Sequence, residues 1–340
     1  MAKREAIEKP DDEEQPSKVE ETFYFSATSS VKTFSSGCAL LDCVLGGGIA
    51  RGRVLNIVGD KSTGKTLLAE EALANFDREV GGLIRYNEVE AAFDESYARN
   101  LGLPLDRVEF VQNCFTVEQL LEDLKATVKR IPEGQEGLYI VDSLDALSDT
   151  AELDRKVGEG SYNTGKAKMM SQMFRQVIQH CENKLTIIVI SQVRDNIGVT
   201  FGEKHTRSGG RALDFYATQI LWLSQTGVLK RTIDGIERPI GLTVKGKCKK
   251  NKIGMPMRDC VFPLIFGFGV DDVRAGLEWL HEIKSTDEVS LTPEQTTRLI
   301  SRLHKISNEE YASYRKIVSE VVLSRWKRIE EAFAPKRRKY

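Results

Sequence analysis

The sequence predicts an α/β fold in which helices cover a central, mostly parallel sheet. From Val31 to about Val270, short apolar segments alternate with longer segments of helical periodicity, the pattern of a parallel sheet. A glycine-rich motif stands between one apolar segment and the helical segment after it. The chain has 340 residues, of which 41% are hydrophobic, so it can form one large domain with a sizeable core and some appendages.

Composition and charge narrow the class of protein. No run of about 18 or more apolar residues occurs and the first residues are charged, so we expect a cytoplasmic protein with no membrane partner. The net charge is −1, yet residues 245–258 contain six basic and no acidic side chains, and residues 160–211 contain eight basic and three acidic ones. These blocks predict a local site for a polyanion, and a solvated lysine face is the plainer alternative. The six cysteines are scattered, so a zinc site is not expected.

The local pattern predicts the individual elements. Residues 1–22 are polar and contain prolines, which indicates a mobile leader, and the aromatic segment 22–28 resembles a strand. Residues 226–246 predict a hairpin that turns at Asp234 and Gly235. Five more segments are predicted as strands, namely 54–58, 83–86, 138–141, 185–190 and 220–223.

Beyond Glu282 the pattern is helical. Thr292 and Gln295 flank Pro293 in the order of an N-cap, a first-turn proline and a capping-box glutamine. Ser307 and Glu310 offer a second capping box ahead of a long helix.

The glycine-rich motif matches G-x-x-x-x-G-K-[ST], a phosphate-binding loop. Its glycines allow backbone N–H groups to surround phosphate oxygens, and the following helix adds its positive N-terminal dipole. Lys65 would contact the β- and γ-phosphates of ATP, while the Thr66 hydroxyl would bind Mg²⁺. Asp142, at the end of an apolar strand, would hold the same Mg²⁺ through water, and a helix N-cap is its plainer role. The predicted phosphate-binding residues are Gly59, Asp60, Lys61, Ser62, Thr63, Gly64, Lys65 and Thr66.

Several segments, taken in order, resemble the bacterial RecA recombinases, and the likeness extends from about Val31 to Leu280. The segments are 34–42 before Gly46, Gly47 and Gly48; Glu90 before Asp94 and 97–102; 191–202; 207–216; and 250–253. Three features depart from the family: the first DNA loop matches loosely, Lys61 replaces the usual acid, and the chain ends basic rather than acidic. A phage-encoded or otherwise divergent member would fit.

The resemblance implies a RecA-like P-loop ATPase core with a short N-terminal docking arm and a small helical C-terminal domain. We therefore expect a leader and subunit-docking arm at 1–30, the ATPase and DNA-binding core at 31–280, and a helical domain with a basic tail at 281–340. The implied function is an ATP-dependent DNA recombinase of recombination and repair. It would form helical filaments on single-stranded DNA without sequence preference and exchange strands with double-stranded DNA.

The resemblance also assigns roles within the ATPase site. Glu90 would activate the water that attacks ATP, with Glu88 as a rival in the same segment. Gln192 would sense the γ-phosphate and signal to the adjoining DNA loop; a strand-end glutamine that faces solvent is the alternative. Lys250 and Lys252 would reach across the subunit interface to a neighbour's ATP. Asp94 and Tyr97 stand at the positions of the residues that contact adenine in the family.

Two glycine-containing loops, 157–165 and 194–210, are the expected DNA site, with contacts to the nucleic-acid backbone rather than to base edges. The basic tail beyond Pro335 is predicted to help capture duplex DNA, although helix-dipole compensation explains part of the charge before it. The residues expected to bind DNA are Lys168, Arg175, Arg194, Ile197, Val199, Phe201, Arg207, Gly209, Gly210 and Arg211.

Two other functions share part of this pattern. A RecA-fold hexameric helicase has the same phosphate loop, but the lysine pair 250 and 252 replaces a lone arginine finger and disfavours it. An ATP-gated coat on single strands that barely hydrolyses ATP is disfavoured because Glu90, Lys65, Thr66 and Asp142 are all present.

Overall fold

A computed structural model describes residues 31–90, 93–150, 164–180, 184–195, 205–207 and 210–337. Contacts divide the chain into Met1–Val31 and Lys32–Tyr340, and every helix and strand named here belongs to the second unit.

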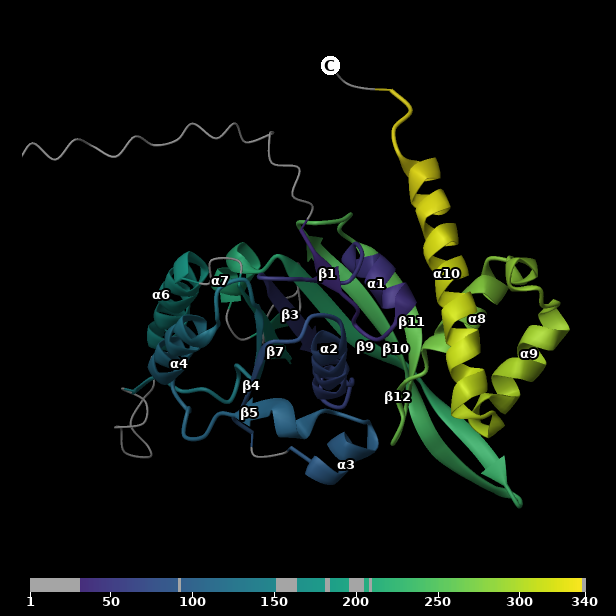
Figure 1. Ribbon diagram of the computed structural model, residues 1–340, viewed down its shortest axis with the longest axis horizontal. Helices are drawn as coiled ribbons and strands as arrows, with labels where there is room; N and C mark the ends of the chain where they lie inside the picture. Colours follow the sequence, from purple (N-terminus) through teal and green to yellow (C-terminus); the bar gives the residue numbers. More distant parts are fainter. Residues whose placement is uncertain are drawn as a thin grey trace, which may run out of the picture. The chain divides into compact units, whose positions relative to one another are not determined.

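The second unit is built on a ten-stranded sheet with the order β12-β11-β10-β9-β3-β7-β6-β4-β5, to which β8 adds by pairing with β7 (Figure 1). All pairings from β9 to β5 are parallel, whereas β9 to β12 pair antiparallel, so the predicted mostly parallel sheet is confirmed. The strands of this sheet are β3 (Val54–Gly59), β4 (Leu83–Glu88), β5 (Val108–Phe110), β6 (Gly137–Asp142), β7 (Leu185–Asp195), β8 (His205–Arg207), β9 (Gln219–Ile233), β10 (Ile236–Asn251), β11 (Arg258–Ile265) and β12 (Gly269–Val270). A separate pair joins β1 (Thr33–Phe34) to β2 (Ile49–Ala50).

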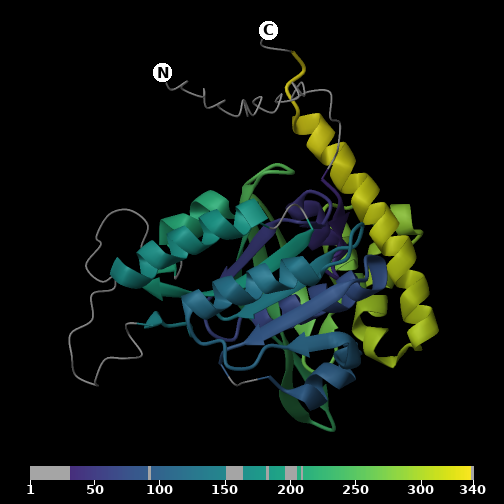
Figure 2. The ribbon, with the colours of Figure 1, turned by 60° about the vertical axis from the view of Figure 1, so that its left-hand side comes forward.

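Helices cover both faces of the sheet. Alternate residues of each strand point to opposite sides, so one strand contributes apolar side chains to a core on each face. Leu55 and Ile57 belong to a core with α1 (Ala39–Leu45), α2 (Lys65–Glu79), α8 (Asp272–Glu282) and α10 (Asn308–Phe333). Val54 and Val58 belong to a second core with α4 (Val117–Arg130), α6 (Thr164–His180) and α7 (Gly210–Tyr216). Figures 1 and 2 show the two helical layers with the sheet between them.

Each of the five predicted strands lies within an observed strand, and the hairpin joins β9 to β10 at the predicted turn. Asp234 and Gly235 both adopt positive φ, 52° and 79°, as a tight hairpin turn requires. Only Gln219–Leu223 of β9 pair with β3, so the rest of the hairpin extends past the parallel strands. Its ladder is interrupted at Pro239/Gly241, Thr243/Val244 and Cys248/Lys250. The hairpin projects from the body of the unit in Figure 1.

The C-terminal helices begin where the sequence predicts. Thr292 and Gln295 form the capping box at the start of α9 (Pro293–Arg302). At α10 the Ser307 side chain accepts a hydrogen bond from the Glu310 N–H, which is one of the two bonds that a capping box has. The shorter elements are α3 (Glu95–Asn100) and the 3₁₀ turns η1 (Leu105–Arg107), η2 (Thr286–Val289) and η3 (Leu303–Lys305).

Hydrogen bonds tie helix α10 to the start of α8 and to the segment that precedes α1. Arg315 Nε donates to Asp272 Oδ2 over 3.1 Å, and the same guanidinium donates to the carbonyl of Gly37. The other oxygen of Asp272 accepts from the Ala39 N–H at 2.8 Å. The last turns of α10 extend beyond the sheet and its helices (Figure 2). A boundary between core and C-terminal domain near residue 280 stays a prediction.

Across the described part of the chain, every helix is too short or too polar to cross a lipid bilayer.

Candidate nucleotide-binding and DNA-binding site

The phosphate-binding loop connects the end of β3 to the start of α2. Gly64 is the N-cap of α2 with φ of 81°, and a Cβ atom there would clash with the Leu264 side chain. Lys65 as a whole residue is 9% exposed, and its Nζ donates to the Asp60 carbonyl at 2.7 Å. Burial lowers the pKa of Lys65, although Asp142 and other acids oppose that shift. A buried ammonium at the mouth of such a loop suits a phosphate ligand.

A second group of side chains lies beside this loop because β6 ends level with β4. Asp142 is in register with Glu88, and its Oδ2 accepts from the Thr66 hydroxyl at 2.8 Å and from the Tyr86 hydroxyl at 3.0 Å. Burial raises the pKa of Asp142, while the hydrogen bonds from Thr66 and Tyr86 act against it. Hydroxyl and carboxylate oxygens are the ligands that Mg²⁺ prefers, so Thr66 and Asp142 fit the predicted role.

Glu90 and Gln192 meet at the same edge. Gln192 lies in register with Gly59, the first residue of the phosphate loop. Its Nε2 donates to Glu90 Oε1 at 3.2 Å, and the Ser143 hydroxyl donates to the same oxygen. The Gln192 backbone N–H donates to Asp145 Oδ2 at 2.7 Å. The structure therefore joins the predicted base directly to the predicted sensor.

The nucleotide cleft has a volume of about 560 Å³ and runs from the phosphate loop to α3. Asp94 caps α3 by accepting from the Tyr97 N–H, and the Tyr97 hydroxyl accepts from the Gly267 N–H at 3.3 Å. The cleft is lined by Ser62, Thr63, Gly64, Lys65, Thr66, Leu67, Glu70, Phe93, Asp94, Tyr97, Gln225, Leu242, Leu264 and Phe266. The predicted phosphate and adenine residues thus share one cleft.

The lysine pair lies away from this cleft. Lys250 is in register with Ile220, and Ile220 pairs with Asn56 near the start of β3. The phosphate loop begins at the other end of β3. Lys250 Nζ donates to the carbonyls of Asp214 and Phe215, and Lys252 Nζ donates to the Phe215 carbonyl at 3.4 Å. Phe215 itself is 71% exposed. Within one chain the pair is therefore not brought to the phosphate loop.

The predicted DNA residues fall into three groups. Lys168 and Arg175 are exposed on α6, and Arg175 Nε donates to the Tyr216 hydroxyl at 3.4 Å. Four lie in described backbone: Arg194 in β7, Arg207 in the paired strand β8, and Gly210 and Arg211 in α7. The remaining four, together with the loop 157–163, lie outside the described residues: Ile197, Val199, Phe201 and Gly209.

Some side chains of the site were not predicted from the sequence. Ser143 and Asp145 follow Asp142 directly and hold Glu90 and Gln192, so a search of that loop for donors and acceptors would have found them. Tyr86 stands two residues before Glu88 and so faces the same side of β4. Glu70 lies one helical turn after Thr66 and lines the cleft.

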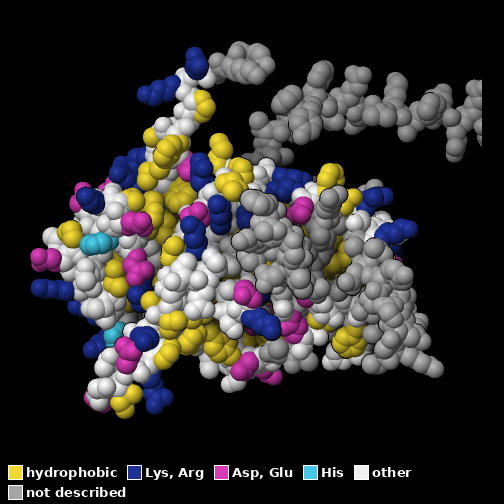
Figure 3. Space-filling model, turned by 180° about the vertical axis from the view of Figure 1, so that it is seen from behind, with side chains coloured by type: hydrophobic (Ala, Val, Ile, Leu, Met, Phe, Trp, Pro, Cys, Tyr) yellow, Lys and Arg dark blue, Asp and Glu magenta, His cyan; other side chains and the backbone are white. Residues whose placement is uncertain are grey.

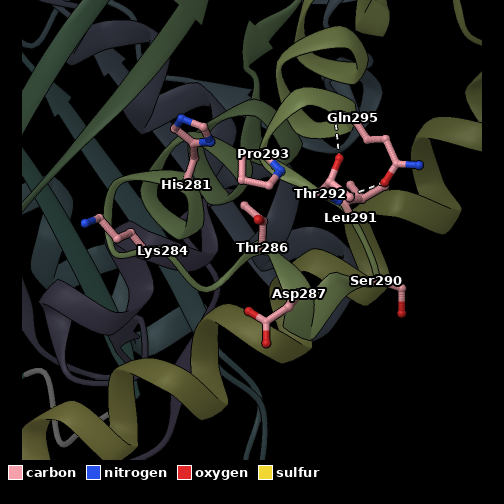
Figure 4. Close-up of a pocket in the computed structure, with 9 residues that line it drawn as sticks. All are labelled: His281, Lys284, Thr286, Asp287, Ser290, Leu291, Thr292, Pro293 and Gln295. Atoms are coloured by element: carbon pink, nitrogen blue, oxygen red, sulfur yellow. Dashed lines mark hydrogen bonds between the residues drawn. The ribbon is translucent and has the colours of Figure 1, made fainter.

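A second hollow, about 750 Å³, lies where α8 ends and α9 begins (Figure 4). Most of its lining residues are exposed, and two of its polar side chains, Thr292 and Gln295, are engaged in the capping box. The lining offers no arrangement comparable with the phosphate loop.

Comparison with known proteins agrees with this geometry. Residues 20–271 match the family model described as the RecA N-terminal domain. The protein named RecA of Arthrospira platensis is 36% identical over 258 residues, which cover 76% of this chain and 68% of that protein. RecA of Nostoc punctiforme is 36% identical over 253 residues, covering 74% and 68% respectively. RecA of Lactococcus lactis subsp. cremoris is 35% identical over 247 residues, covering 72% and 62%. With its phosphate loop, strand-end acids and glutamine in one cleft, the chain belongs to the RecA family.

Proposed function

We propose that this protein polymerises as a helical filament on single-stranded DNA and uses ATP to pair that strand with homologous duplex and exchange strands. As a RecA-family member it is an ATP-dependent DNA recombinase of recombination and repair, and a DNA-dependent ATPase. The observation that carries the finer proposal is the hydrogen bond from Gln192 to Glu90. It connects the hydrolytic carboxylate to the strand that leads into the second DNA loop.

Nucleotide binding follows from the loop geometry. The backbone N–H groups of the loop and Lys65 bind the phosphates of ATP, and Thr66 and Asp142 hold Mg²⁺, which would neutralise phosphate charge when bound. Glu90 orients a water molecule and accepts its proton as the water oxygen attacks the γ-phosphorus and ADP leaves.

Gln192 gives the site a way to report its ligand. Its side-chain amide has two N–H donors, of which one is bonded to Glu90. Among the described residues no acceptor takes the other, so it can bind a γ-phosphate oxygen. Because Arg194 follows two residues later in β7, a shift of Gln192 on ATP binding moves the start of the second DNA loop.

The remaining partners are assigned by charge and position. Lys250 and Lys252 contact ATP bound to the adjacent subunit, which is supported by their distance in register from their own phosphate loop. Lys168, Arg175 and the two loops bind the backbone of single-stranded DNA. The basic tail after Pro335 contributes to capture of the duplex.

Electron microscopy with single-stranded DNA and a non-hydrolysable ATP analogue tests the proposal. Helical filaments are expected; closed rings would instead favour a hexameric helicase. In a strand-exchange assay the wild type is expected to exchange strands, whereas filaments without exchange would indicate a coat. Gln192→Ala should retain ATP binding but lose the stimulation of hydrolysis by DNA. Gln135→Ala, an exposed glutamine outside the site, is the matched control.

A further inference from the structure

Glu70 is a buried carboxyl group in the nucleotide cleft. It lies on α2 one turn after Thr66, its side chain lines the cleft, and the residue is only 4% exposed. No described residue donates a hydrogen bond to its carboxylate, and the carboxylate oxygens reach the space of the cleft, since they are not among the fully buried polar atoms that lack a partner. A ligand that fills the cleft excludes water from these oxygens, so the ligand has to supply a hydrogen-bond donor in place of the water.

The charges around Glu70 limit what that ligand group can be. Burial raises the pKa of Glu70 to about 7, and the carboxylates of Asp142, Glu71 and Asp94 act in the same direction. A phosphate group would add negative charge to this acidic surrounding and is repelled. The phosphates have their own place beside Lys65, at the N-terminus of the same helix.

The rest of the cleft suits the neutral part of a nucleotide. Phe93, Leu242, Leu264 and Phe266 line it together with Glu70 and offer apolar surface to a flat base. The only strong hydrogen-bond donors on adenosine are the amino group of the base and the hydroxyls of the ribose.

We propose that Glu70 accepts a hydrogen bond from one of these nucleoside donors and so contributes to the choice of nucleotide. This inference rests on the proposed function, because it takes ATP as the occupant of the cleft. It adds a specificity-determining residue on α2, separate from the phosphate loop and from Asp94 and Tyr97.

Calorimetric titration with four nucleotides tests the assignment. These are ATP, 2′-deoxy-ATP and 3′-deoxy-ATP, which each lack one ribose hydroxyl, and purine riboside triphosphate, which lacks the 6-amino group. We expect the wild type to bind one of the analogues about tenfold more weakly than ATP, the value of one hydrogen bond to such a group. The analogue that is weakened identifies the donor.

Two variants and one control separate recognition from structure. Glu70→Leu should bind ATP as weakly as that analogue, so that the tenfold preference disappears. Glu70→Gln keeps an acceptor oxygen and should retain most of the preference. Glu122→Gln, an exposed glutamate on α4, should match the wild type in every titration. Without nucleotide, Glu70→Leu should melt at a higher temperature than the wild type, because the variant lacks a carboxyl group whose ionised form is disfavoured by burial.

Other outcomes overturn the proposal. If folded Glu70→Leu keeps the wild-type preference, Glu70 does not contact the nucleoside. If Glu70→Leu weakens all four nucleotides equally, or melts at a lower temperature, Glu70 supports the shape of the cleft instead. A wild type that binds no nucleotide and shows no DNA-dependent hydrolysis would refute the proposed function itself, and this assignment with it.

Discussion

Glu90 and Glu88 are close in sequence but occupy different positions at the end of β4. Glu88 is the last residue of the strand, opposite Asp142, and is partly buried, whereas Glu90 is exposed and bonded to Gln192 and Ser143. Glu90→Gln should therefore bind ATP and DNA normally and hydrolyse ATP about 10²–10⁴-fold more slowly, the usual loss of a general base. Steady-state hydrolysis with saturating single-stranded DNA measures this, with Glu88→Gln for comparison. Full turnover by Glu90→Gln would move the role of base to Glu88.

Glu70 also predicts a dependence of stability on pH. Its pKa in the folded protein is about 7, above the ordinary value of 4.5, so the folded state favours the protonated carboxyl. With respect to this carboxyl, the folded state is most stable below pH 4.5 and loses that stability as the pH rises through 7, because the unfolded chain ionises first. Glu70→Gln should reduce the fall in stability between pH 5 and 8, as measured by urea unfolding of the nucleotide-free protein. Parallel curves for the two proteins would contradict this.

At the level of residues, sequence motifs predicted the phosphate side of the site better than the rest. All residues of the loop 59–66 are adjacent in the sequence, so the sequence motif alone predicts the conformation of the loop. Ser143, Asp145 and Tyr86 take part only because three parallel strands end side by side, and that register depends on tertiary pairing. Glu70 resembles any polar helix residue in the sequence, and its burial in the cleft depends on tertiary packing around α2.

Among the elements, α8 and α10 depend on one small residue for their close approach. A Cβ atom at Gly276 would clash with the Val318 side chain, which is 2% exposed. Gly276→Ala should therefore destabilise the protein by about 1–3 kcal/mol, even though alanine favours a helix by about 1 kcal/mol over glycine. Thermal and urea unfolding measure the change.

A double-variant cycle checks the cause. In a Val318→Ala background the same Gly276→Ala change should cost much less or be stabilising, because the Val318 methyl groups are absent and only the contact with Val322 at 3.2 Å remains. Equal losses in both backgrounds would show that the clash is not the reason.

Predictions for the elements were most accurate where local signals mark an end. The turn at Asp234 and Gly235 and the capping box at Thr292 were found in place because turn and cap residues act over a few positions. Strands β7 and β9 continue past their predicted apolar stretches, since pairing with β8 and β10 extends them into polar sequence. Apolar patterning detects the buried part of a strand and not its exposed extension.

For the whole molecule, the position of the lysine pair predicts a shared active site. A Lys65→Ala protein and a Lys250→Ala/Lys252→Ala protein should each lack DNA-dependent hydrolysis. Mixed filaments should regain part of it, because one kind of junction then combines an intact phosphate loop with an intact lysine pair. Hydrolysis measured across mixing ratios tests this, with co-assembly verified by fluorescence transfer. If co-assembled mixtures stay inactive at every ratio, the lysines do not complete a neighbour's site.

The long hairpin of β9 and β10 has a consequence for solubility. Beyond Leu223, β9 has no strand beside it on its β3 side in the described part of the chain, and such an open edge can recruit strands from other molecules. The tip carries Ile233 and Ile236, 62% and 59% exposed, and the projecting end at the lower left of Figure 3 shows apolar atoms flanked by charged ones. Pro239 offers no N–H and adjoins a break in the ladder, while Lys230 and Glu237 place charge along the ribbon. These features hinder amyloid-like stacking of hairpins. Many copies of the protein can therefore lie close together and associate through specific contacts without aggregating along this exposed edge.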